Sequence, residues 1–111
     1  MKLDNIAEVI ATRTLKLVGD DAAASEVLVL VGKPQRLPDH TDYYCPYQIK
    51  GVGPDKLGYV CGIDPMQALL LTLSTLGVEV EILNKKMGGR LRWDCDDSGG
   101  FGFPPVSPGS L

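Results

Sequence analysis

The sequence predicts an α+β domain in which an antiparallel sheet of four to five strands is covered on one face by one main amphipathic helix. Three observations lead to this class. Several segments alternate apolar and polar residues with the two-residue period of a half-buried strand. One segment opens with a helix-capping signal and then spaces its apolar residues by three and four. The chain has 111 residues, which is room for a single domain.

The composition is that of a soluble globular protein. Hydrophobic residues make up 44% and charged residues 23% of the chain, which excludes a disordered acidic tail, a collagen and a coiled coil. The net charge is -3 and the basic residues are scattered, so nucleic acid is not an expected partner. We find no signal peptide, and the longest strongly apolar run, residues 68–71, is far shorter than a membrane span. We therefore expect a cytoplasmic protein without a membrane partner.

The first two predicted strands are residues 6–18 and 26–31. The first alternates apolar and polar side chains, as a half-buried strand does. The second is apolar on both faces and rich in valine, which favours a strand that is central or covered on both sides. Residues 32–42 contain Pro34 and Pro38, so we expect a long connection without regular structure there.

Residues 43–50 and 57–63 form the predicted β-hairpin. Both segments alternate, and a turn rich in glycine and proline separates them. Pro46 cannot donate a ladder hydrogen bond, so it places the first strand at a sheet edge or at a bulge. Gly58 and Gly62 share one face of the second strand, which predicts that another element packs closely over that face.

The main helix is predicted to begin directly after Asp64. Asp64 is the N-cap, a proline occupies the first helical position, and Gln67 is placed to bond back to the Asp64 amide. The helix ends either at Gly77, before a further strand, or at about Leu83; the unbroken period favours continuation, in which case Gly77 needs a packing reason. The predicted apolar stripe is Met66, Leu69, Leu70, Leu73 and Leu76, with Gln67, Thr72, Ser74 and Thr75 off it.

The last predicted strand runs over residues 90–95. Leu91, Trp93 and Cys95 face one way in this segment, and Trp93 is expected to close the core. The final residues are rich in glycine, proline and serine. We therefore expect one domain over residues 1–104 and a flexible tail over residues 105–111.

The three cysteines are expected to be reduced thiols that pack as small core hydrophobes. Cys45, Cys61 and Cys95 form no C-x-x-C pair, and each shares an alternating face with large apolar residues. A zinc set of these three with His40 lacks the closely spaced ligand pairs of structural zinc sites. We therefore expect neither a bound metal nor a cofactor.

The sequence contains no evident catalytic set. Its single histidine, His40, lies in the proline-bounded loop beside two aspartates, and three acids lie at the end of the last predicted strand, after Trp93. The full calcium-loop pattern is not present around these acids. An alternative function, a small enzyme or ligand-binding domain, would need the fold to bring the His40 loop together with Asp94, Asp96 and Asp97.

Three tyrosines form the candidate partner surface. Tyr43, Tyr44 and Tyr47 cluster beside Pro46, and they are interpreted either as a protein contact or as plain sheet packing. Small size and acidic balance favour a non-enzymatic protein-binding module, for example an immunity or antitoxin-like protein that occludes another protein. A monomer is one state of such a module; a homodimer that pairs the Pro46 strand at a sheet edge is the other.

Several short segments carry a resemblance that spans roughly residues 10–104. The segments are Cys45-Pro46-Tyr47-Gln48-Ile49, Gly62-Ile63-Asp64 with Gln67-Ala68-Leu69, Arg90-Leu91-Arg92-Trp93 and Gly102-Phe103-Pro104. In them the chain resembles a family of small bacterial proteins of unknown function. The resemblance implies a compact α+β domain, usually a stand-alone bacterial protein, and it carries over no catalytic or binding residue.

Overall fold

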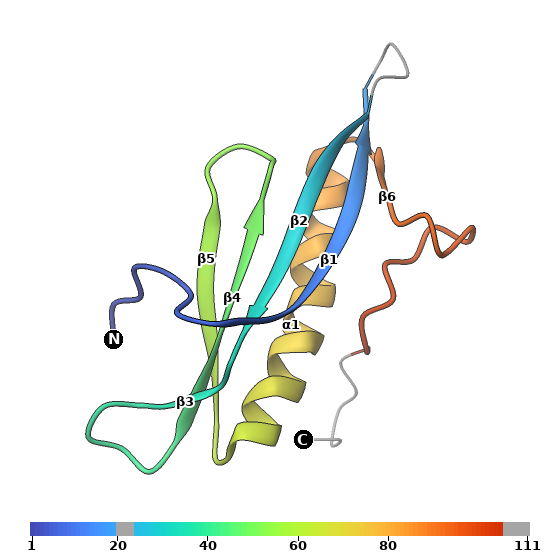
Figure 1. Ribbon diagram of the computed structural model, residues 1–111. Helices are drawn as coiled ribbons and strands as arrows, with labels where there is room; N and C mark the ends of the chain where they lie inside the picture. Colours follow the sequence, from blue (N-terminus) through green and yellow to red (C-terminus); the bar gives the residue numbers. More distant parts are fainter. Residues whose placement is uncertain (20–23, 106–111) are drawn as a thin grey trace.

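The computed structural model describes residues 1–19 and 24–105 and confirms the predicted α+β class (Figure 1). In this part of the chain a single helix, α1 (Pro65–Lys86), lies on one face of one antiparallel sheet. The four strands longer than two residues are the four that precede the helix in the sequence-based prediction. The strands are β1 (Val9–Val18), β2 (Ala24–Gly32), β3 (Gln35–Arg36), β4 (Tyr43–Lys50), β5 (Lys56–Gly62) and β6 (Leu91–Arg92).

Strand β4 is central in the sheet. It pairs with β5 along its length on one side, and on the other side with β2 at residues 47–50 and with β3 at residues 43–44. Of the two settings predicted for Pro46, a sheet edge or a bulge, the sheet edge is therefore wrong. Pro46 lies opposite the interval between β2 and β3, where the ladder is interrupted, so a residue without an N–H is tolerated in a central strand. The expectation of no regular structure in residues 32–42 is also wrong, because β3 lies there.

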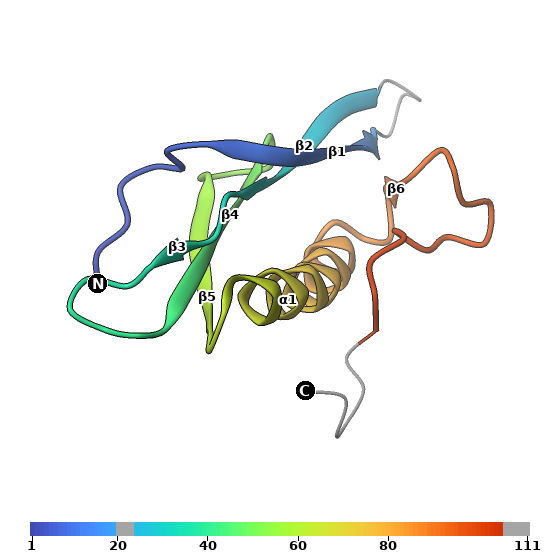
Figure 2. The same ribbon diagram turned by 60° about the horizontal axis from the view of Figure 1, so that its bottom comes forward.

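Helix α1 packs against β4 and β5 (Figure 2). Gly62 of β5 allows the approach of the helix, and Gly58 makes room for a ring of β4 on the same face. A Cβ on Gly62 would lie 2.4 Å from the backbone nitrogen of Ala68, and a Cβ on Gly58 would lie 2.7 Å from the Tyr47 ring. The prediction of close packing over this face of β5 is confirmed. The buried core between the layers includes Leu15, Val27, Val29, Cys45, Ile49, Ala68, Leu76, Val80 and Leu91.

The start and the length of α1 follow the predicted signals. The Asp64 carboxylate accepts a hydrogen bond from the Gln67 amide at 2.7 Å. The Gln67 side chain accepts from the amide of Ile63 at 2.8 Å, one residue earlier than the capping box predicts. The helix continues through Gly77 to Lys86, as the unbroken apolar period favours.

The buried face of α1 is rotated relative to the predicted stripe. Met66 is 65% exposed and Leu70 is 45% exposed, although both belong to that stripe. Thr72, predicted off the stripe, is fully buried, and its hydroxyl donates to the Ala68 carbonyl at 2.8 Å. This local bond satisfies the hydroxyl and permits its burial. The buried helix positions are Ala68, Thr72, Ser74, Leu76 and Val80.

Residues 93–105 run from β6 along the side of α1 that lies away from β5 (Figure 1). Phe101 is part of the buried core. Phe103 passes over Gly77, where an added Cβ would lie 3.0 Å from the Phe103 Cβ. The close approach of this segment is the packing reason for a glycine within the helix.

The guanidinium of Arg13 holds residues 93–105 against β1. It lies 4.1 Å from the centre of the Trp93 ring and 5.0 Å from the centre of the Phe103 ring. Its Nη1 donates to the Phe101 carbonyl at 2.9 Å. Trp93 is half-buried and packs against the core from outside, and β6 is shorter than the predicted strand. Residues 106–111 of the predicted tail lie outside the described residues.

Cysteine burial differs from the prediction at two of three positions. Cys45 is buried, and its Sγ donates to the Gly32 carbonyl at 3.3 Å. Cys61 is exposed because it lies on the face of β5 that points away from α1. Cys95 is exposed because β6 ends at Arg92 and residue 95 lies beyond it. Burial raises the pKa of the Cys45 thiol.

These environments predict selective thiol labelling. We expect iodoacetamide at neutral pH to modify Cys61 and Cys95 within minutes and to leave Cys45 unmodified until the protein unfolds, because the reactive species is the exposed thiolate. Intact-mass spectrometry of native and urea-unfolded protein measures this as two adducts against three. A third rapid adduct on the native protein would contradict the burial of Cys45.

By length and composition alone, α1 is a candidate membrane span, with a mean hydropathy of 1.5 over 18 residues, 28% of them buried. This finding differs from the sequence-based expectation, which considered only the continuous run at residues 68–71. The polar residues that follow this run are uncharged, and the first charged side chain after it is Glu79. A core helix passes the same test, so the finding alone does not place the helix in a membrane.

Candidate functional site

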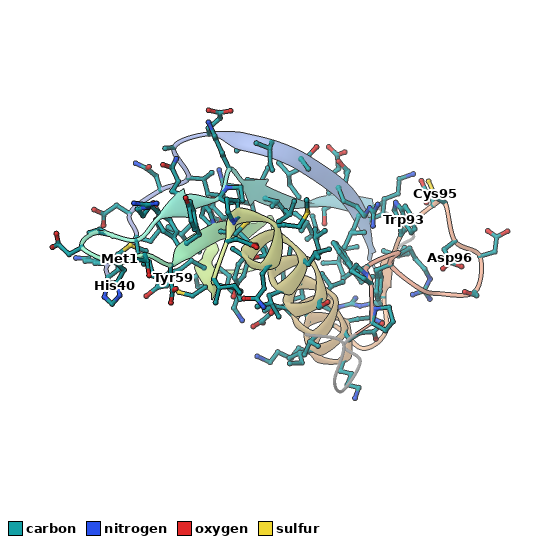
Figure 3. The ribbon with its side chains drawn as sticks, turned by 90° about the horizontal axis from the view of Figure 1, so that it is seen from below. Met1, His40, Tyr59, Trp93, Cys95 and Asp96 are labelled. Carbon is teal, nitrogen blue, oxygen red and sulfur yellow. The ribbon has the colours of Figure 1, made fainter. Side chains whose placement is uncertain are left out.

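The residues of the alternative enzyme or ligand site lie far apart. His40 is near Met1 and Tyr59 at one end of the molecule, and Asp96 is at the opposite end (Figure 3). The longest dimension of the molecule is 51 Å. His40 is exposed, and its backbone amide closes a turn onto the Leu37 carbonyl at 3.2 Å. The structure does not assemble this site.

Two of the three acids near residue 95, Asp94 and Asp96, have local roles. Asp94 forms an ion pair with Lys16 at 2.6 Å, which ties the segment after β6 to β1 and raises the pKa of that lysine. Asp96 accepts from the hydroxyl and the amide of Ser98, and these bonds lower the pKa of its carboxyl. Within residues 1–19 and 24–105, no three histidine, cysteine or acidic side chains gather to hold a metal ion.

The three tyrosines of the candidate partner surface lie on two faces of β4. Tyr43 and Tyr47 point toward α1 with the core, and Tyr47 is only 7% exposed. Burial, and then the charge of Glu79, raises the pKa of Tyr47. Tyr44 points to the opposite face of the sheet, so the three do not form one platform.

Tyr44 instead belongs to a group on the outer face of the β4–β5 hairpin. Its ring meets the Tyr59 ring edge to face, with centroids 5.9 Å apart. Cys61, the register partner of Tyr44, is exposed beside them. We call Tyr44, Tyr59 and Cys61, together with the outer backbone edge of β5, the β5 edge surface.

In the described part of the chain, β5 pairs with β4 alone, so its outer edge has no ladder partner. At one end Lys56 forms an ion pair with Glu79 of α1, which fixes β5 against the helix. Sequence reasoning placed Tyr59 in a strand but did not select it. The alternation of apolar residues placed Tyr59 on the same face as Leu57 and Cys61, as the structure does. Which strand lies at the edge of the sheet depends on the strand order, however, and not on this local pattern.

A second candidate surface is the outer face of α1. Ile63, Met66, Leu70, Val78 and Ile82 each expose 45% or more of their area, although all five are large and apolar. Beside the second half of the helix, a groove of about 630 Å³ lies between α1 and residues 100–105. Its lining includes Ser74, Val78, Glu81, Ile82, Lys85 and Phe103.

Comparison with known proteins gives one match. No curated protein and no solved structure matches this chain. A family model described as a domain of unknown function, DUF6968, matches residues 11–105, and this range runs from within β1 to the end of the segment that crosses Gly77. Because the model covers nearly the whole chain, the protein belongs to the DUF6968 family, a domain of unknown function.

Proposed function

We propose that this protein is a non-enzymatic protein-binding module that takes up an extended segment of another protein along the free edge of β5. The observation that carries this proposal is the unpaired outer edge of β5. An extended segment that adds to a sheet edge gains main-chain hydrogen bonds, and its alternate side chains contact the two faces of the sheet.

The sequence of β5 lacks the usual protection of an edge strand, and the N-terminus touches the strand at Tyr59, whose hydroxyl donates to the Met1 carbonyl at 3.5 Å. Soluble proteins blunt such edges with proline, bulges or charged side chains. Strand β5 contains no proline, and its single charged residue, Lys56, stands at the start of the strand in an ion pair with Glu79. An added strand would place every second side chain beside Tyr59 and Cys61 on the outer face.

The kind of partner follows from charge. A net charge of -3 favours a neutral or basic segment. Occlusion of another protein in a bacterial cytoplasm, as an immunity or antitoxin-like protein does it, is the form of this function that a small acidic module supports best.

The test uses a phage-displayed library of random peptides selected on the full chain. We expect Cys61→Lys to weaken the selected peptides at least about tenfold, because lysine on an edge strand opposes strand addition. Thr14→Lys, at an exposed position of β1, is the matched control and should leave binding unchanged. Hydrogen exchange should show protection of β5 amides in the complex.

Two results would overturn this function. One is a library that yields no binding peptide. The other is a set of peptides whose affinity falls with Thr14→Lys and stays constant with Cys61→Lys, which would locate binding at β1.

A further inference from the structure

We infer that residues 1–7 form a strap that covers part of the β5 edge surface and that an incoming segment must displace. The inference rests on the proposed function and adds its regulation, because the strap and the partner compete for one surface. The chain begins beyond β5, on the side away from β4, and crosses the outer face of both strands before it enters β1 (Figures 1 and 2). The strap therefore stands in the path of a strand that adds to β5.

The free end of the strap contacts Tyr59. The Tyr59 hydroxyl donates to the Met1 carbonyl at 3.5 Å, and Figure 3 shows both residues at the same end of the molecule. A strand added to β5 needs the same space, because its outward side chains would lie beside Tyr59. The strap and the added strand cannot hold this position together.

The middle of the strap is packed loosely on the outer face of β4. Leu3, Asp4 and Asn5 line a hollow of about 250 Å³ together with Tyr44 and Pro46. Leu3 is half-buried, whereas Asp4 and Asn5 are exposed, and residues 1–8 contain no helix or strand. A segment held by few contacts over an unfilled space opens at a low cost in free energy. The strap can therefore be displaced without unfolding the sheet.

The base of the strap is fixed to the sheet. An added Cβ on Gly32 would lie 2.6 Å from the Ile6 Cγ2 and 2.5 Å from the Pro46 Cγ, so Ile6 lies against the end of β2 beside Pro46. The Glu8 carbonyl accepts a hydrogen bond from the Lys33 amide at 2.8 Å. The segment that precedes Ile6 is thus a tethered competitor with a high effective concentration at the edge surface.

The strap can be shortened without altering the matched domain or the charge. The DUF6968 match begins at residue 11, so the strap lies outside the matched range. Residues 2–5 carry one lysine and one aspartate, so their deletion leaves the net charge at -3. A change in affinity after this deletion therefore reports the strap and not a change in electrostatic attraction.

The test compares the full chain with a chain that lacks residues 2–5. The probes are the phage-selected peptides whose binding Cys61→Lys weakens, which are those that bind at the β5 edge. One exposed hydrogen bond and one half-buried leucine hold residues 1–5, so we expect the strap to be open about a tenth of the time. The shortened chain should then bind these peptides about tenfold more tightly.

Point variants provide the control. Leu3→Ser should give part of the gain in affinity, because it removes the half-buried side chain of the strap. Val9→Ser makes a similar change outside the strap, at a position of β1 that is 43% exposed, and should leave the affinity unchanged. Circular dichroism should show all three proteins folded. Should the shortened chain unfold, Leu3→Ser decides the same comparison.

Nuclear magnetic resonance follows the strap itself. We expect the heteronuclear NOE of the residue 3–5 amides to fall to the value of a free peptide as the selected peptide saturates the full chain. Unchanged values in the complex, or equal affinity of the full and shortened chains, would overturn the strap and leave the proposed function standing. A library that yields no edge-binding peptide would overturn the proposed function, and the regulatory role of the strap with it.

Discussion

Replacing Gly62 with alanine is expected to lower the free energy of unfolding by about 3 kcal/mol. The added Cβ would lie 2.4 Å from the backbone nitrogen of Ala68 and 2.8 Å from its Cα. Both atoms belong to the helix backbone, so no side-chain rotation relieves the overlap. Helix α1 must move away from β5, and the contact between the two layers loosens. Urea unfolding followed by circular dichroism measures the loss.

The neighbouring residue provides the control for this variant. Cys61 lies in the same strand, on the face that points away from α1, and is exposed. Cys61→Ala should change the free energy of unfolding by less than about 0.5 kcal/mol. Equal stability of Gly62→Ala and Cys61→Ala would contradict the close approach of α1 to β5.

The elements that sequence reasoning located correctly are those fixed by neighbouring residues. The β4–β5 hairpin follows from two alternating segments and the turn between them. The start of α1 follows from Asp64 and the proline after it, and continuation through Gly77 follows from an apolar period that does not break. Each signal is contained within a few residues of the chain.

The corrections come from contacts between residues far apart in sequence. Thr72 is buried because Gly62 lets the helix approach β5 at Ala68, which sets the rotation of α1. That rotation in turn exposes Met66 and Leu70. Hydrophobicity along the helix does not contain this information, since leucines occupy more than one side of it.

The candidate surfaces divide in the same way. Tyr44 and Tyr47 point to opposite faces of β4, and the local alternation predicts this. That β5 and not β4 has the free edge depends on the pairing of β2 and β3 with β4. That pairing is non-local, so Pro46 suggested the wrong strand as the edge.

Phe101→Ala is expected to have the largest effect, a loss of about 4 kcal/mol in the free energy of unfolding. The ring is 4% exposed and belongs to the buried core. Helix α1 packs against β4 and β5, and residues 93–105 lie on its other side, where Arg13 of β1 holds them. Removal of the Phe101 ring leaves a cavity there that the short β6 cannot fill.

Variants of Arg13 and Phe101 distinguish two causes of this loss of stability: a local cavity at the Phe101 ring, and undocking of the whole segment 93–105. Phe101→Leu keeps most of the volume and should cost less than about 1.5 kcal/mol, whereas Arg13→Leu removes the carbonyl bond and both ring contacts and should cost about 2 kcal/mol. If the segment docks as a unit, the double variant Arg13→Leu, Phe101→Ala will lose less than the sum of the two single losses. Strict additivity, or a loss below about 1 kcal/mol for Phe101→Ala, would mean that residues 93–105 do not complete the core. Residues 100–105 of this segment form one wall of the groove beside α1. In that event the groove would not be a stable feature of the fold.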